Sequence, residues 1–400
     1  MDDLFKRRAT MFGGLLAGLL AAHLGASPAW AQAAPPTPAQ DQPAPPSGSG
    51  TPAQTPAPDS SVVSFFRQTE VSGFVDVYLG YNFNTPSTRQ AEVRNFDIQH
   101  DSFSLNLAEL SLEKKPTADS RAGFRVDLDY GPTATVVSAA EPGGTQTFQN
   151  ILQAYASYLA PLGQGLQFDI GKFVTPIGNE VIKTRDNWNY SRSLLFTLAE
   201  PYYHAGVRVS YSVNDHFSLL GLLVNGWNNV VDNNSGKTVG VQATLKPSAA
   251  LTIVQSYMGG PEQANDNADW RHLVDTVITY TATPTVSLAM NYDYGRDTVA
   301  GSPVTWQGVA GYLRYQPKPW FAITPRVEYY GDPNGFTTGV TQKLKETTLT
   351  MEFKHKDGVL LRAEYRRDMS DKPFFLKDVS SMVTHQDTLT VGIVYAFSSR

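Results

Sequence analysis

The stretch Thr285–Gly295, TVSLAMNYDYG, alternates between apolar and polar side chains. Successive side chains of a β-strand point to opposite faces of the sheet, so this segment predicts a strand with one apolar and one polar face. Its length also matches the roughly ten residues with which an outer-membrane strand crosses a bilayer. The apolar face comprises Val286, Leu288, Met290, Tyr292 and Tyr294, and the polar face comprises Ser287, Asn291 and Asp293.

The same alternation returns at 320–330, 359–367 and 389–397. After Glu70 no window as long as an outer-membrane span has helical periodicity, and the pattern predicts about sixteen strands. Pro325 lies on the apolar face of its segment. Because proline cannot donate to the ladder, we expect a bulge or irregular pairing at that position.

A soluble sandwich strand also has one apolar face, so the connections must separate the two folds. The expected gaps alternate in length, as in a barrel with short turns at one end and long loops at the other. The sequence therefore predicts an up-and-down antiparallel transmembrane β-barrel. The short gaps are 161–165, 213–215, 247–250, 316–319 and 356–358, and the long gaps are 84–100, 173–203, 228–236, 259–270, 331–342 and 369–384.

The polar face of the expected strands is ionic. A narrow, filled barrel would keep apolar or small groups inside, whereas a wide lumen accepts charge. Aromatic residues near strand ends, such as Tyr81 and Phe397, fit interfacial girdles. The charged residues expected on the lumen-facing wall are Arg125, Asp127, Asp129, Asp293, Arg314, Arg326, Glu328, Arg362, Glu364 and Arg366.

The first residues have the features of an export signal. Lys6, Arg7 and Arg8 precede an apolar run, and Ala29-Trp30-Ala31 supplies a cleavage site, so we predict a signal peptide over 1–31. Residues 32–66 are rich in Ala, Pro, Gln, Gly, Ser and Thr, which predicts a disordered periplasmic tether. The barrel is then expected over 67–400.

Composition and motifs exclude several functions. The net charge of -5 and the lack of a long basic run argue against nucleic-acid binding. The chain has no cysteine and therefore no thiolate ligand or nucleophile. The histidines have no metal-ligand spacing, and neither a G-x-S-x-G elbow nor a phosphate loop occurs. We therefore expect no catalytic residues, no metal and no cofactor, and a protein that is not an enzyme.

From about Gly73 onward the chain resembles the putative beta-barrel porin-2 family. The resemblance implies a porin-like barrel that carries solutes across a bacterial outer membrane. The last strand also resembles the terminal strand that outer-membrane assembly machinery recognises, although three residues follow Phe397. The stretches that carry the resemblance are Ser72-Gly73-Phe74-Val75-Asp76, Asp169-Ile170-Gly171-Lys172-Phe173-Val174-Thr175-Pro176-Ile177-Gly178, Asp186-Asn187-Trp188-Asn189-Tyr190-Ser191-Arg192-Ser193 and Asn225-Gly226-Trp227-Asn228.

The connection 173–203 is the longest and follows the fifth expected strand, where general porins have a loop that folds into the lumen. We expect it to narrow the channel; an extracellular cap is the alternative. Its aromatic residues are expected to pack on the wall, while its charges face solute. The expected constriction residues are Glu180, Lys183, Arg185, Asp186 and Arg192. The charges are nearly balanced in sign, with a slight lean toward anions because arginine presents paired donors.

The sequence thus favours a porin of a Gram-negative outer membrane, forming a water-filled channel for passive diffusion of small polar solutes and ions. Its expected partners are outer-membrane lipid, the assembly machinery and the solutes, with a homotrimer as one assembly state. The alternative is a barrel without an open pore that serves in adhesion or as a structural element, because loops such as 232–236 and 262–269 are polar enough to bind Ca²⁺ or sugar.

Overall fold

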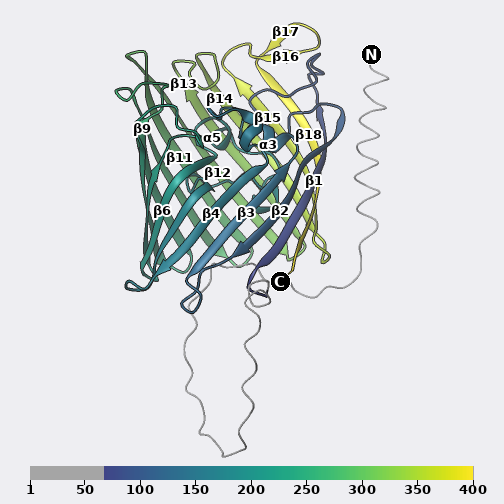
Figure 1. The fold of residues 1–400 in the computed structure, drawn as a ribbon. Coiled ribbons are helices and arrows are strands. Elements are labelled where there is room, and N and C mark those ends of the chain that lie inside the picture. Colours follow the sequence, from purple (N-terminus) through teal and green to yellow (C-terminus); the bar gives the residue numbers. More distant parts are fainter. Residues whose placement is uncertain (1–66, 400) are drawn as a thin grey trace, which may run out of the picture. The chain divides into compact units, whose positions relative to one another are not determined.

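A computed structural model of the chain describes residues 67–399. Sixteen antiparallel strands close into one barrel, which confirms the predicted fold and strand number (Figure 1). The strands are β1 (Glu70–Asn82), β2 (Ser102–Lys114), β3 (Ala122–Tyr130), β4 (Ile151–Ala160), β5 (Leu166–Val174), β6 (Tyr203–Asn214), β7 (Phe217–Val224), β8 (Thr238–Ser248), β9 (Leu251–Pro261), β10 (Trp270–Thr283), β11 (Val286–Val299), β12 (Ser302–Lys318), β13 (Phe321–Asp332), β14 (Gln342–Lys354), β15 (Val359–Ser370) and β18 (His385–Ser398).

The barrel closes where β1 pairs with β18 in continuous register from Ser72↔Ser398 to Asn82↔Thr388. Every other strand pairs with its neighbours in sequence, apart from a small hairpin of β16 (Phe375–Lys377) and β17 (Ser381–Val383) that lies within the last loop. The long connections gather at the end of the barrel that carries this hairpin, and the short turns at the other (Figure 1). No strand edge is therefore left unpaired in the ring.

Pro325 leaves a gap in one ladder without a bulge. On the β14 side the register runs unbroken through Pro325↔Leu349. On the β12 side the pairing passes from Tyr312↔Arg326 directly to Tyr315↔Ile323. Irregular pairing was thus predicted correctly, and it is confined to the side where proline would have had to donate its missing N–H.

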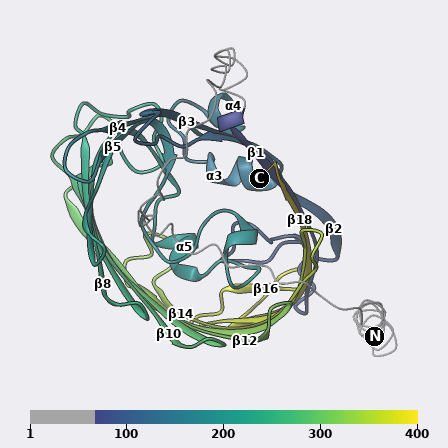
Figure 2. The same cartoon turned by 90° about the horizontal axis from the view of Figure 1, so that it is seen from below.

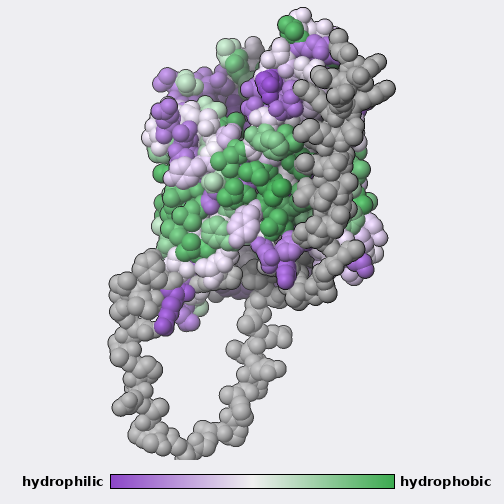
Figure 3. All heavy atoms as spheres, turned by 90° about the vertical axis from the view of Figure 1, so that its right-hand side faces the viewer, coloured by the Kyte–Doolittle hydropathy of each residue, from purple (hydrophilic) through white to green (hydrophobic). Residues whose placement is uncertain are grey.

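The two faces of the wall differ in the way the alternation predicts. The large exposed apolar residues, such as Val75, Leu288, Val327 and Tyr395, lie on the outer face. Charged residues at alternating positions of the same strands, such as Asp76, Asp293 and Arg326, are buried inside. Figure 3 shows hydrophobic residues forming a band between hydrophilic ends. This is the arrangement of a barrel with lipid outside and polar groups inside. Among residues 67–399, no helix is long and apolar enough to cross a membrane.

Short helices lie inside the ring of strands. Seen along the barrel axis, α3 (Pro132–Val137) and α5 (Leu194–Leu198) are enclosed by the wall (Figure 2). Helix α3 and the following α4 (Thr145–Phe148) belong to the connection between β3 and β4, which the sequence did not predict as a long loop. The predicted signal peptide (1–31) and tether (32–66) lie outside the described residues.

Val327 provides a test of the lipid-facing surface. It lies near the centre of β13 on the outer face, with 57% of its surface exposed. We expect Val327→Arg to lower the free energy of folding into phospholipid vesicles by about 2–4 kcal/mol, because a lipid-facing arginine near the midplane must be desolvated. Urea titrations followed by tryptophan fluorescence would measure the loss, with Val327→Ile as the control. Equal stability of the two variants would contradict a lipid-facing position.

Candidate functional site

The connection between β5 and β6, residues 175–202, lies inside the barrel and is called the inward connection below. It packs on the inner wall through an apolar surface. Ser193 caps α5 by accepting a hydrogen bond from the Phe196 amide at 3.0 Å. Leu194, Leu195 and Ala199 then form a buried cluster with wall residues of β11 to β14 and with the hairpin. The wall and hairpin members of this cluster are Ala289, Trp306, Ala310, Tyr312, Tyr330, Leu344 and Phe375.

Three arginines of β13 and β15 bind the main-chain carbonyls of this connection. Arg362 donates to the carbonyl oxygens of Thr184 at 2.6 Å and Asn189 at 3.1 Å, and also to that of Asn187. Arg326 donates to the Ser191 carbonyl at 2.8 Å, and Arg366 donates to the Arg192 carbonyl at 2.6 Å. Guanidinium donors thus satisfy carbonyls that no regular secondary structure pairs.

Carboxylates on the same wall bind the amides of the connection. Glu364 accepts from Tyr190 N at 2.7 Å and from Ser191 N at 3.0 Å. Glu328 accepts from Leu194 N at 2.7 Å. The arginines of β13 and β15 therefore bind carbonyl groups of the connection, and the glutamates bind its amide groups. Together these hydrogen bonds fix the position of the backbone.

Lys183 binds the strands that follow β18 and β1 in the ring. Its ammonium group lies 2.8 Å from carboxylate oxygens of both Glu109 on β2 and Asp127 on β3. Near it, Tyr190 donates to Asp76 of β1 at 2.8 Å. Burial and the neighbouring Asp76 raise the pKa of Tyr190 well above its ordinary value, so its hydroxyl remains a donor. These contacts follow one arc of the wall, from β13 and β15 past β18 to β1, β2 and β3. The start of the connection reaches the side opposite β2 and β3, where Asn179 N donates to Asn291 of β11 at 2.8 Å.

The five predicted constriction residues divide into two groups. Glu180, Lys183 and Arg192 are buried: Glu180 pairs with Arg326 at 2.9 Å and accepts from Ser193 N, and the Arg192 guanidinium lies 4.5 Å from the Phe96 ring centroid. Arg185 and Asp186 keep 22% and 53% of their side chains exposed. The buried three hold the chain in place, which leaves Arg185 and Asp186 as the charges in contact with solvent.

All predicted wall charges are on the inner face, but most are covered. Only Arg125 retains a sizeable exposed fraction, 23% of its side chain. The inward connection covers many of the others, so they bind protein groups where the sequence led us to expect solvated side chains. The buried wall charges are Asp127, Asp129, Asp293, Arg314, Arg326, Glu328, Arg362, Glu364 and Arg366.

Two further segments contribute to the interior, and the sequence pointed to neither. In the connection between β1 and β2, Arg94 pairs with Asp97 and donates to Thr388 of β18 at 2.5 Å. Phe96 from the same connection packs with Phe196 and with Val137 of α3. Three connections thus share one interior core.

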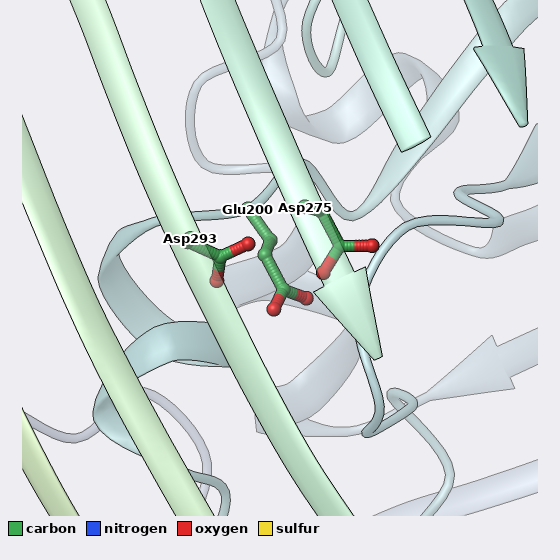
Figure 4. Close-up of side chains that lie close together, drawn as sticks. All are labelled: Glu200, Asp275 and Asp293. Carbon is green, nitrogen blue, oxygen red and sulfur yellow. The ribbon is translucent and has the colours of Figure 1, made fainter. Parts of the chain in front are cut away.

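Three acidic side chains meet beside the end of the inward connection. Glu200 lies between Asp275 of β10 and Asp293 of β11, and all three are buried (Figure 4). Carboxylate oxygens of the three groups lie within 4.8 Å of one another. Burial and the charges of Asp293 and Asp275 raise the pKa of Glu200 well above its ordinary value. Within residues 67–399 this is the one group of acids and histidines close enough to hold a metal ion, although the sequence predicted no metal.

Comparison with known proteins gives the family. A family model described as putative beta-barrel porin-2, OmpL-like, matches residues 68–397. No curated protein matches the chain.

Solved structures of low sequence identity share the fold. An anion-selective porin from Comamonas acidovorans has a TM-score of 0.58 at 11% identity over 82% of this chain and 99% of its own. The outer membrane channel DcaP of Acinetobacter baumannii has a TM-score of 0.55 at 14% identity over 82% and 97%. OmpT, an outer membrane protein of Vibrio cholerae, has a TM-score of 0.55 at 10% identity over 82% and 97%.

The contribution of the arginines can be tested with a matched pair of variants. Arg362 and Arg314 both pair with Glu352, at 2.7 and 2.5 Å, but only Arg362 also binds carbonyls of the inward connection. Losing one partner of a buried charged network costs about 3–5 kcal/mol. We expect Arg362→Met to increase tryptic cleavage after Lys183 and Arg185 by about 100-fold or more, while Arg314→Met stays resistant. Equal cleavage of the two variants would show that Arg362 does not hold the connection.

Proposed function

Because the chain belongs to the putative beta-barrel porin-2 family, we propose that this outer-membrane barrel is a porin whose channel is narrowed by the connection between β5 and β6. Small polar solutes and ions would cross it by passive diffusion through water. The proposal rests chiefly on one observation: this connection lies inside the ring and is bound to strands on opposite sides of it, through Asn291 on β11 and through Glu109 and Asp127 on β2 and β3. A cap packed on the outer loops would not make such contacts with the inner wall.

Several further properties are part of the proposal. An exported precursor would lose residues 1–31, and residues 32–66 would form a periplasmic tether ahead of the barrel. The last strand, β18, would present Phe397 to the assembly machinery, and the mature barrel would lie in the outer membrane of a Gram-negative bacterium, with a homotrimer as one assembly state. A channel requires no catalytic residues, which agrees with family membership and the absence of a hydrolase motif in the sequence.

A second candidate is surface binding by the outer loops. The loops after β7 and β9 together form a hollow of about 360 Å³ lined by amide and carboxylate groups. Such a surface suits a sugar or a cation. Single-channel recording separates the candidates, since only a porin gives stable current steps in a planar bilayer. The lining residues are Asp232, Asn233, Asn234, Ser235, Asn265 and Asn267.

Gly392 allows the channel-narrowing role to be tested from the wall. A Cβ atom added there would lie 2.1 Å from Cε2 of Tyr190, whereas one added to Gly221 meets nothing within 4 Å. We expect Gly392→Val to push the inward connection away from β18 and to change single-channel conductance by about twofold or more, since conductance follows the narrowest cross-section. Gly221→Val should conduct like the unaltered protein. Unchanged conductance of correctly folded Gly392→Val would contradict narrowing at this position.

The solvent-exposed charges of the connection predict ion selectivity. Arg185 and Asp186 lie 3.6 Å apart, between Nε and Oδ2, and carry opposite charges. A charge lining a narrow passage biases which ion enters. We expect Arg185→Gln to shift the reversal potential in a salt gradient toward cations and Asp186→Asn to shift it toward anions, from a baseline of slight anion preference. Shifts in the same direction, or none, would show that these residues do not line the ion path.

A further inference from the structure

Two of the three acids in the cluster of Glu200, Asp275 and Asp293 lack partners, whereas Asp275 accepts hydrogen bonds at both oxygens, from Gly178 N and from Asn291 Nδ2. Neither carboxylate oxygen of Glu200 or of Asp293 has a hydrogen-bond partner, although the exposed fractions of these residues are only 4% and 0%. Two nearby acids are matched, since Asp297 pairs with Arg271 at 2.8 Å and Glu180 pairs with Arg326. Within residues 67–399 no lysine, arginine or histidine forms an ion pair with the cluster.

The strand register places two of the acids directly opposite each other. Asp275 and Asp293 are direct cross-strand partners of β10 and β11, and both point inward. Like charges directly opposite one another destabilise a sheet, and the connection adds a third acid between them. Leaving buried charged groups without a partner is costly, so the arrangement requires a positive ion or protons.

The backbone around the cluster holds Glu200 in place. The Ala199 carbonyl accepts from Nε1 of Trp306 at 3.3 Å, and Tyr202 N donates to the side chain of Asn228 at 2.6 Å. Both neighbours of the Glu200–Pro201 pair are thus anchored to other parts of the barrel. Its carboxylate is directed at the two aspartates, as Figure 4 shows, rather than toward solvent.

Gly178 completes the enclosure from the start of the same connection. Its amide donates to Oδ1 of Asp275 at 3.3 Å. It adopts φ +89°, and a Cβ atom there would lie 1.9 Å from Oε2 of Glu200. Only glycine lets the backbone approach the carboxylate this closely in this conformation. Both ends of the inward connection, Gly178 and Glu200, therefore lie against the aspartates of β10 and β11.

We propose that Glu200, Asp275 and Asp293 bind a Ca²⁺ ion that joins the end of the inward connection to β10 and β11. Three carboxylates offer oxygen ligands alone, which suit a hard cation, and the cluster contains no nitrogen or sulfur ligand of the kind that zinc prefers. Ca²⁺ accepts six to eight oxygens in irregular geometry, whereas Mg²⁺ requires a near-ideal octahedron and retains water.

The ion would attach the connection to β10 and β11, which the three arginines do not contact. Arg326 of β13 and Arg362 and Arg366 of β15 bind residues 184–192 of the connection. Glu200, at its far end, lies instead against β10 and β11. An effect of the ion on conductance rests on the proposed porin function. Binding of the ion does not, so the test measures Ca²⁺ binding and thermal stability without conductance.

The test uses full-length protein refolded into detergent without lipopolysaccharide, treated with EDTA and titrated with Ca²⁺ by calorimetry at neutral pH. We expect Glu200→Gln and Asp293→Asn each to bind about one Ca²⁺ fewer per chain than the unaltered protein. Asp129→Asn is the matched control, because Asp129 is also an inner-wall acid with no hydrogen-bond partner for either carboxylate oxygen, but lies on β3. It should bind as many ions as the unaltered protein, and ions on the outer loops would appear equally in all four proteins.

A second variant guards against loss of folding. Gly178→Ala keeps all three acids but places a methyl group against Glu200, so we expect Ca²⁺ affinity to fall at least about tenfold. Heat-modifiable migration in gels would check that each variant forms the barrel. Ca²⁺ should also raise the melting temperature of the unaltered and Asp129→Asn proteins but not of Glu200→Gln. Equal Ca²⁺ binding by folded Glu200→Gln and the unaltered protein, or none by either, would overturn the proposal and leave shared protons as the compensation.

Discussion

Buried guanidinium groups on β13 and β15 determine how the interior of this barrel is organised. An irregular connection inside a barrel carries amides and carbonyls that cannot pair in a ladder, and each unpaired buried group costs free energy. Arg326, Arg362 and Arg366 satisfy the carbonyls, and Glu328 and Glu364 satisfy the amides. The wall thereby replaces the water that an open lumen would supply.

This arrangement depends on the closure of the ring. Strands with complete hydrogen bonding at both edges can face lipid without unpaired backbone, so polar side chains near the middle of the strands can be directed inward. The inner wall consequently holds far more charge than a soluble core would accept. Part of that charge binds the inward connection, and part, such as Arg125, keeps contact with solvent.

The sequence predicted the barrel well because period-two alternation is a local property. The segment at 285–295 shows its two faces without reference to any partner, and the number of strands follows by repetition. The connection between β3 and β4 was missed because α3 is only Pro132–Val137, too short for helical periodicity to be visible, and its neighbours have no alternation. Burial of Glu180 and Lys183 could not be predicted either, since charge alone does not show whether a side chain meets water or an opposite charge.

The acidic cluster shows most clearly where local pattern stops being informative. Asp293 was expected on the inner wall from the alternation of its own strand, but its cross-strand partner Asp275 depends on the register between β10 and β11. Glu200 reaches them only because the apolar residues after Ser193 seat α5 on β11 to β14. Three acids from separate parts of the chain therefore converge through packing. Convergence that raises electrostatic cost requires compensation, and on this wall the nearest arginines already bind other acids. A connection bound to β13 and β15 by arginines and glutamates, and to β10 and β11 through a cation, would be held by two different kinds of interaction. A chelator would then act on one attachment without releasing the other.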